Sequence, residues 1–450
     1  MKNKLKVVGK SSWKTLASEV RSSLSKSILV DGYHLVLDLE KSEGSILVDA
    51  SNGKEYIDLF SMFASQPIGV NHKDLLEEAF LLKLGLVASQ KPVNSDVYTQ
   101  PYADFVKVMS RIVTEDYPHL FFIEGGSLAV ENALKVAFDW KMRKNLESEI
   151  EVNENLLSIA HLEKSFHGRS GYTLSLTNTA DPKKTMYFPK FDWPRLPSPY
   201  REFPESNESL ESLTKAEDDF LSRLDAFEKE NPNQMAAVLM ETIQGEGGDN
   251  HFRNEFLQRV RGWCNENHVL LIFDEVQCGM GITGEWWAWQ NTGVKPDIFS
   301  FGKKSQVCGI AASNRIDDVD NCFKVSSRIN STWGGNLVDM VRVTKYIEVI
   351  EREKLLENCK NIGSFLIEEL QKIANDFDGL VTNVRGLGLM CAFDLPDGET
   401  RDKVRSCLVE EGVLILGCGD RSLRFRPVLD ISRDVISKAL TLIRKALKKV

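Results

Sequence analysis

The stretch Val269-Leu-Leu-Ile-Phe-Asp274 places one carboxylate directly after five apolar residues. A run this short and this apolar predicts a strand buried on both faces, as in the parallel sheet of an α/β domain. An ionised carboxylate at the end of such a strand needs a cationic partner, because an uncompensated buried charge is costly. Asp274 is therefore a candidate functional residue, although a helix N-cap or an ion pair with a nearby arginine would also explain it.

A second predicted strand, Ile298–Phe301, ends one glycine before Lys303. Parallel strands present ligands at their carboxyl ends, so we expect Asp274 and Lys303 at the same edge of one sheet. Desolvation there lowers the pKa of an amine and favours the neutral form that attacks carbonyl groups. Lys303 and Lys304 form a charged doublet, and doublets are usually solvated. Of the two, Lys303 is preferred because it directly follows the glycine at the end of the strand.

Pyridoxal 5′-phosphate would suit this pair of residues. Its protonated pyridine nitrogen is a partner for Asp274, and its aldehyde forms a Schiff base with a lysine such as Lys303. Gly125-Gly126-Ser127 could hold the phosphate, because glycines admit an anion close to the backbone and the following helix points its N-terminus at it. Any strand-to-helix turn can contain glycines, so this turn alone is a weak signal.

The rest of the chain alternates between strand-like and helical patterns. Strand-like runs lie at 119–123, 156–160 and 236–241, and helical patterns lie at 128–143, 210–229 and 256–267. This alternation predicts an α/β layer with a mainly parallel central sheet. A second, smaller α+β domain is predicted from a helical pattern at 340–374, strand-like runs at 380–385, 389–395 and 423–428, and a helix from Ser432. Short strands near 36–39 and 46–49 should join it, which divides the chain into 1–80, 81–337 and 338–450.

Composition and charge exclude several classes of protein. The net charge of −9 opposes binding to nucleic acid and to anionic membranes. No apolar run is long enough to cross a bilayer, and the lysine-rich start of the chain lacks the apolar stretch of a secretory signal. The eight cysteines form no C-x-x-C pair and the seven histidines are scattered, so we expect no metal site and a cytoplasmic enzyme with reduced thiols.

Three further motifs carry residues that can bind a planar ring or a carboxylate. In Phe166-His-Gly-Arg169 the aromatic side chain could cover the cofactor ring and the arginine could hold a carboxylate. Arg424, in Arg424-Phe-Arg-Pro427, is a second candidate for a carboxylate, and Glu246 lies in a glycine-rich segment where it could pair with an arginine. Each of these charged residues could equally form an ordinary surface ion pair.

Five motifs in this order resemble the class III pyridoxal-phosphate aminotransferases, from about residue 28 to the C-terminus. They are Phe166-His-Gly-Arg169, Glu241-Thr-Ile-Gln-Gly-Glu-Gly-Gly248, Phe273-Asp-Glu-Val-Gln277, Phe301-Gly-Lys-Lys304 and Arg424-Phe-Arg-Pro427. The resemblance implies a fold type I transferase that works as a homodimer. It also implies roles for Lys303 as the Schiff-base lysine, Asp274 at the pyridine nitrogen, Gln277 near the ring oxygen and the substrate, and Phe166 on the ring. Gly126 and Ser127 would bind the phosphate, joined by Thr332 of the partner subunit.

Within the class, four segments are most similar to the branch that acts on the terminal amine of lysine. These segments are 170–178, 188–195, 302–309 and 330–335. The similarity implies L-lysine as amino donor and 2-oxoglutarate as acceptor, with Arg169 holding the α-carboxylate of lysine. Glu246 would mask Arg424 in the lysine half-reaction and release it for 2-oxoglutarate in the other.

The chain departs from many class III members at a few positions. Leu128 stands where many have a carboxylate, Thr242 stands where many have a proline, and Lys304 begins a segment that replaces a glycine-rich one. These departures favour the lysine branch over ornithine, 4-aminobutyrate or diamine donors. An amine isomerase of the same fold is a further alternative, but it would have little use for a Glu246–Arg424 switch. A binding protein without activity would not need the Schiff-base lysine.

Overall fold

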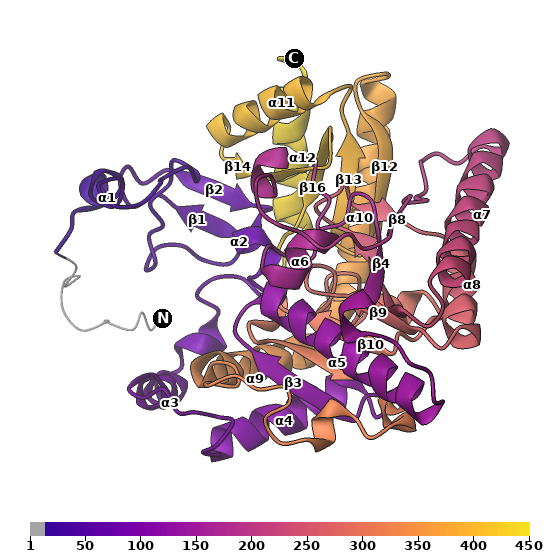
Figure 1. Ribbon diagram of the computed structural model, residues 1–450. Coiled ribbons are helices and arrows are strands. Elements are labelled where there is room, and N and C mark those ends of the chain that lie inside the picture. Colours follow the sequence, from indigo (N-terminus) through magenta and orange to yellow (C-terminus); the bar gives the residue numbers. More distant parts are fainter. Residues whose placement is uncertain (1–13) are drawn as a thin grey trace.

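A seven-stranded sheet forms the centre of the computed structural model, which describes residues 14–450 (Figure 1). In spatial order its strands are β3 (His119–Ile123), β11 (Cys308–Ala312), β10 (Ile298–Phe301), β9 (Leu270–Asp274), β6 (Met235–Glu241), β4 (Ser158–Leu162) and β5 (Arg195–Leu196). Only β11 runs antiparallel to its neighbours in this sheet. The mainly parallel sheet predicted from the sequence is confirmed. The antiparallel strand β11 was not predicted, because most of its residues are small.

Helices cover both faces of this sheet. Every side chain of β9 is therefore buried, and its residues alternate between two apolar clusters. Ile272 packs on the side of α5 (Gly126–Glu147), together with Ala133 and Trp140. Leu271 and Phe273 pack on the opposite side, into a cluster shared with three helices. These helices are α4 (Gln100–Val113), α8 (Asn254–Glu266) and α9 (Leu337–Arg352). Each such apolar side chain contributes roughly 1.5–3 kcal/mol of burial free energy.

The C-terminal part forms the smaller α+β unit that the sequence predicted. Its four-stranded antiparallel sheet has the order β12 (Thr382–Leu387), β13 (Met390–Asp394), β16 (Ser422–Phe425) and β15 (Leu416–Cys418), and its helices are α10 (Leu355–Asp376), α11 (Gly398–Glu410) and α12 (Arg433–Leu447). The single helical pattern expected at 340–374 is two helices, because Lys354 adopts a left-handed conformation (φ 53°) between α9 and α10. No helix of the described chain is long and apolar enough to cross a membrane.

Residues 46–58 join the C-terminal unit through a three-stranded sheet. Strand β2 (Glu55–Asp58) lies between β1 (Ile46–Val48) and β14 (Val413–Leu414), as the indigo and yellow ribbons in Figure 1 show. The strand expected at 36–39 does not form, since only one isolated bridge joins Leu37 to Asp49. Residues 1–13 of the predicted N-terminal segment lie outside the described residues. Helix α9 packs against α3 (Glu78–Ala88) and α4.

Candidate active site

The carboxyl ends of β9 and β10 bring Asp274 and Lys303 to one edge of the sheet. Ser300 pairs in register with Asp274, and its hydroxyl donates a hydrogen bond of 3.0 Å to Oδ1 of that carboxylate. The backbone N–H of Val276 donates to the same oxygen at 3.0 Å, and Nδ1 of His167 lies 2.8 Å from Oδ2. The buried carboxylate is therefore held by polar donors, and within the described chain no arginine pairs with it.

Lys303 follows Gly302 in a left-handed backbone conformation (φ 52°). A non-glycine residue in this conformation costs roughly 1–2 kcal/mol, and such strain is typical of functional sites. Burial lowers the pKa of Lys303, an effect opposed by the carboxylate of Asp274 and reinforced by Arg424. The amine is thus partly desolvated and lies within electrostatic reach of both a carboxylate and a guanidinium group.

Lys304 is fully buried and its side chain serves a structural purpose. Its Nζ donates hydrogen bonds to the carbonyl oxygens of Gln66 (2.9 Å) and Pro427 (3.2 Å) and to the hydroxyl of Ser61 (3.3 Å). Burial lowers the pKa of Lys304 to about 7. Its donors are occupied by the N-terminal and C-terminal segments, which leaves Lys303 as the lysine at the sheet edge.

Glycines bring three loops into direct contact beside Lys303. A Cβ atom at Gly126 would lie 3.0 Å from Cγ1 of Val276, and one at Gly302 would lie 3.3 Å from the same atom. At Gly168 (φ 118°) it would lie 2.4 Å from Oγ of Ser127. The turn before α5, the loop after β9 and the Phe166–Arg169 segment therefore meet in one place, with the first N–H groups of α5 at their junction.

Phe166 and Ser127, the predicted cofactor-binding residues of these loops, are held by different hydrogen bonds. The backbone N–H of Phe166 donates to Oε1 of Glu241 (3.0 Å), and burial raises the pKa of that carboxyl to about 7. Oγ of Ser127 lies close to the hydroxyls of Ser170 and Thr173, the latter at 2.8 Å. In this arrangement the backbone N–H groups at the start of α5 are the more open donors for a phosphate.

A cluster of three buried arginines lies on β12 and β16 and directly after β16. Arg385 pairs with Asp394 at 2.8 Å, and Arg426 pairs with Asp249 at 2.7 Å. Arg424 has no carboxylate partner in the described chain, and its buried Nε donates to nothing there. A buried guanidinium with an unused donor and no carboxylate partner has the chemistry to bind a carboxylate.

Arg424 and Gln277 contact each other in the single chain. Arg424 donates to Oε1 of Gln277 at 2.6 Å, and Arg426 donates to the same oxygen at 3.0 Å. Glu246 does not contact Arg424, because its carboxylate binds Nζ of Lys184 (2.6 Å). In this structure Glu246 is therefore paired with Lys184 and not with Arg424, and the amide of Gln277 contacts Arg424 and Arg426.

Arg169 and Thr332 are both exposed on the surface of the single chain. Among the described residues, neither side chain forms a hydrogen bond or an ion pair. The backbone carbonyl of Thr332 accepts a hydrogen bond from Ser95. Their expected roles, one toward substrate and one toward a partner subunit, stay predictions.

These residues fit pyridoxal 5′-phosphate. A carboxylate suited to a pyridinium nitrogen, a partly desolvated amine and the open N-terminus of a long helix converge on one sheet edge. Several contributors were not singled out from the sequence. His167 and Val276 lie inside quoted motifs and could have been weighed, whereas Lys184 gives no local signal because its partner lies 62 positions away.

Comparisons with known proteins agree with this geometry. The family model of class III aminotransferases matches residues 29–447. The L-lysine-epsilon aminotransferase of Amycolatopsis lactamdurans is 50% identical over 428 residues, which cover 94% of each chain. The mitochondrial 4-aminobutyrate aminotransferase of Mus musculus is 30% identical, covering 93% of this chain and 86% of that one.

A solved structure gives the same result for the fold. The lysine aminotransferase from Mycobacterium tuberculosis, in its internal aldimine form, superposes with a TM-score of 0.94 at 47% identity. The match covers 97% of this chain and 100% of that chain. The family model matches nearly the whole sequence, and the residues at the sheet edge fit the cofactor of that family. This chain therefore belongs to the class III aminotransferases.

Proposed function

We propose that this chain transfers the ε-amino group of L-lysine to 2-oxoglutarate, giving 2-aminoadipate 6-semialdehyde and L-glutamate. The observation that carries the transaminase part is Arg424, a buried guanidinium beside Lys303 that lacks a carboxylate of its own. The choice of lysine is supported by the relative named for that substrate, which is 50% identical over 94% of the chain. The relative named for 4-aminobutyrate is only 30% identical.

Class III aminotransferases use pyridoxal 5′-phosphate, which supplies an electrophilic aldehyde and an electron sink for the carbon that loses a proton. In our proposal Asp274 holds the pyridine nitrogen in its protonated form, and Ser300, Val276 and His167 keep the carboxylate oriented. Since an ionised carboxylate accepts hydrogen bonds, the contact with His167 requires the proton of that ring on Nδ1.

Lys303 would have two roles. It would hold the cofactor covalently through Nζ until the amine of the donor takes its place, which frees the lysine amine. The freed Nζ would then move the proton between the carbon that carries the reacting amine and the cofactor side, in one direction with the donor and in the reverse direction with the acceptor. Partial desolvation favours this proton transfer, because it raises the share of the amine that is uncharged.

Two arginines would distinguish the two substrates. Exposed Arg169 is proposed to hold the α-carboxylate of lysine, which leaves the distant ε-amine at the reacting position. Arg424 is proposed to hold the carboxylate next to the keto group of 2-oxoglutarate. We further propose a homodimer in which Thr332 of one subunit completes the phosphate site of the other, and a cytoplasmic location, which the unpaired state of all eight cysteines supports.

Mixing the purified enzyme with L-lysine alone tests the proposed function. The visible absorbance of the bound cofactor should fall, because the amino group stays on the enzyme, and it should recover when 2-oxoglutarate is added. Ornithine and 4-aminobutyrate serve as comparison donors. A full response to ornithine without any response to lysine would overturn the assignment, and recovery without any acceptor would favour an isomerase.

A further inference from the structure

Glu246 lies in the connection between β7 (Ile243–Gln244) and β8 (Asn250–His251), and its backbone is tightly fixed. The N–H of Gly419 donates to the carbonyl of Glu246 at 2.7 Å. A Cβ atom at the adjacent Gly247 would lie 1.9 Å from the carbonyl oxygen of Lys164, and one at Gly245 would lie 2.2 Å from Oε1 of Gln277. These contacts hold the backbone of the loop in place, so we expect Glu246 to change partners by rotating its side chain.

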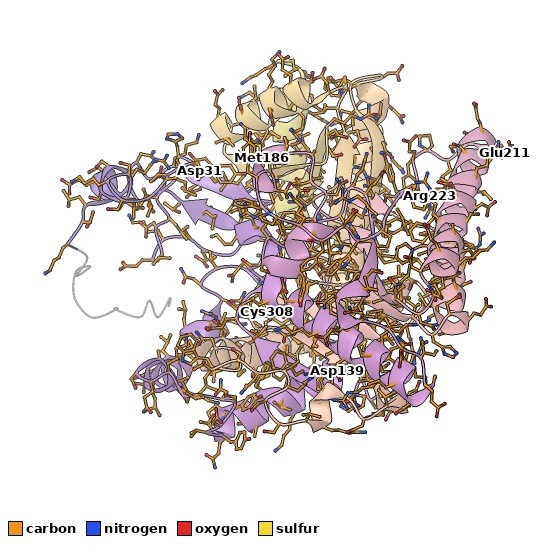
Figure 2. All side chains as sticks on the ribbon, in the orientation of Figure 1. Asp31, Asp139, Met186, Glu211, Arg223 and Cys308 are labelled. Atoms are coloured by element: carbon orange, nitrogen blue, oxygen red, sulfur yellow. The ribbon has the colours of Figure 1, made fainter. Side chains whose placement is uncertain are left out.

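The carboxylate of Glu246 is bound by residues 177–186, the anchoring segment, which follows α6 (Gly171–Leu176). Oγ1 of Thr179 donates to its Oε1 at 2.8 Å, and Nζ of Lys184 donates to the same oxygen at 2.6 Å. The side chains of Glu246 and Lys184 are 20% and 34% exposed, so their attraction is only partly screened by solvent. Met186, labelled in Figure 2, marks the end of this segment.

The anchoring segment is itself a built structure. The N–H of Asn178 donates to the carbonyl of Ser165 at 2.8 Å, and the side chain of Asp181 caps the short helix that carries Lys184, accepting from the N–H of Lys183 at 3.1 Å. Lys184 is therefore presented to Glu246 by fixed backbone, and Glu246 is its carboxylate partner within the described chain.

Lys184 and Arg424 are the two alternative ion-pair partners of Glu246 in this inference. Arg424 donates to Oε1 of Gln277, and that same oxygen lies against Gly245, the residue before Glu246, so the loop that carries Glu246 lies next to Arg424. In agreement with this, burial and the neighbouring Arg426 lower the pKa of Arg424, while Glu246 acts in the opposite direction. Each partner leaves a different site. With Glu246 on Lys184 the guanidinium of Arg424 is open to a carboxylate, and with Glu246 on Arg424 that charge is neutralised.

We propose that Lys184 and Thr179 form a docking position that holds Glu246 away from Arg424 and thereby sets the affinity of the enzyme for the dicarboxylate acceptor. This inference rests on the proposed function, in which Arg424 receives 2-oxoglutarate. Lys184 acts through Glu246 as a positioning residue and does not contact the reacting atoms. When Lys184 is removed, Arg424 is the cation left to Glu246, and the acceptor must compete with it.

The test compares Lys184→Met with wild type on the two half-reactions separately. Calorimetric titration with glutarate, a non-reacting dicarboxylate, gives its dissociation constant, and steady-state kinetics give the KM with respect to the acceptor. We expect both constants to rise roughly fivefold, the equivalent of about 1 kcal/mol for such a partly exposed ion pair. The kcat/KM for lysine should stay the same or rise. Lys184→Arg should restore the wild-type values, and Lys183→Met, which removes the exposed neighbour, should change neither.

A double-mutant cycle isolates the mechanism. In a Glu246→Gln background the uncharged amide has no preference for Arg424, so adding Lys184→Met should leave glutarate affinity unchanged. An equal loss in both half-reactions, or a fivefold loss that persists without Glu246, would overturn the docking proposal. These results are distinguishable from failure of the proposed function, in which the wild-type enzyme itself would not respond to lysine.

Discussion

Lys303 and Lys304 are neighbours in the chain, yet their surroundings give them different chemistry. Nζ of Lys304 is saturated by the two carbonyls and the hydroxyl that it binds. Among the described residues, Nζ of Lys303 forms no hydrogen bond or ion pair, and the charges of Asp274 and Arg424 act on its pKa in opposite directions. Lys303 has a left-handed backbone conformation, and the side chains of the two neighbouring lysines lie in different surroundings.

Replacing these lysines separately tests that division. Lys303→Ala should abolish the visible absorbance of the lysine-bound cofactor and lower turnover of L-lysine by roughly four or more orders of magnitude, as for other essential nucleophiles. Lys304→Ala should keep that absorbance and lower the melting temperature instead, because it leaves two buried carbonyls without donors. Absorbance spectra and thermal melts of both variants measure this, and loss of the absorbance only in Lys304→Ala would reverse the assignment.

The buried amine of Lys304 also predicts a pH dependence of stability. Its pKa is lowered by burial from 10.5 to about 7, so between these values the unfolded chain binds more protons than the folded chain. Stability from this group therefore rises with pH from about 7 to 10.5, by about 1.4 kcal/mol per pH unit at most. Urea unfolding of wild type and Lys304→Met at pH 7 and pH 9 should show the gap between them widen at pH 9. Parallel pH profiles would contradict the expectation.

Single residues show where sequence reasoning succeeds and where it stops. Asp274 and Lys303 could be predicted because each ends a short apolar run, and strand ends meet at one edge. The partner of Glu246 could not be predicted, because the choice between Lys184 and Arg424 depends on how two distant loops pack. Gln277 was expected at the cofactor ring and at the substrate, and both contacts stay predictions; in the single chain its Oε1 accepts hydrogen bonds from Arg424 and Arg426.

At the scale of elements, the start of α5 depends on a loop from another part of the chain. Gly168 has a φ of 118°, and a side chain there would meet Ser127 at 2.4 Å. This glycine lets the Phe166–Arg169 segment lie directly on the first turn of α5. The phosphate end and the ring-covering residue of the proposed site therefore share one contact.

Gly168→Ala should weaken cofactor binding for this reason. Backbone strain and the clash with Ser127 should cost roughly 1–3 kcal/mol, which corresponds to a Kd for pyridoxal 5′-phosphate that is roughly fivefold to 150-fold higher. Titration of the apoenzyme with the cofactor measures this value. The matched control is Gly171→Ala, where the nearest atom to a new Cβ, Oε1 of Glu131, lies 3.9 Å away. Equal effects of both variants would show that the contact at Ser127 is unimportant.

Helices and strands whose apolar residues recur at regular spacing were the easiest to predict. Their exact ends depend on the local backbone conformation. The strands at 119–123 and 298–301 have the predicted bounds, and α7 (Asn207–Glu230) extends the expected 210–229 helix by a few residues. The break at Lys354 escaped prediction because apolar spacing continues across it. Strand β11 escaped because Cys308-Gly-Ile-Ala-Ala312 has few of the residues that favour strands.

At the scale of the molecule, Thr332 and Trp333 are exposed on a single chain although the proposed function needs Thr332 at a phosphate. A second subunit would reconcile these facts. We expect the enzyme to sediment at about twice the 50.8 kDa of one chain, with two equivalent sites that each use both subunits.

Mixed dimers test this shared site. Lys303→Ala removes the amine, and Thr332→Asp should repel the phosphate of the neighbouring site, so either homodimer should be weakly active. Co-expressed together, the two variants should regain about a quarter of wild-type activity, because half of the dimers carry one site with neither change. No gain above the two homodimers would show that Thr332 serves its own subunit.

The three-stranded sheet that joins both ends of the chain has a consequence for biosynthesis. Lys54, just before β2, donates to the carbonyl of Val409, 355 positions later, and β2 pairs with β14. At translation rates of about 5–20 residues per second, the hairpin of β1 and β2 leaves the ribosome roughly 20–70 s before its partner strand exists. During that interval the nascent chain carries an uncovered strand edge, so we expect chaperones to protect β2 until β14 has been synthesised and pairs with it.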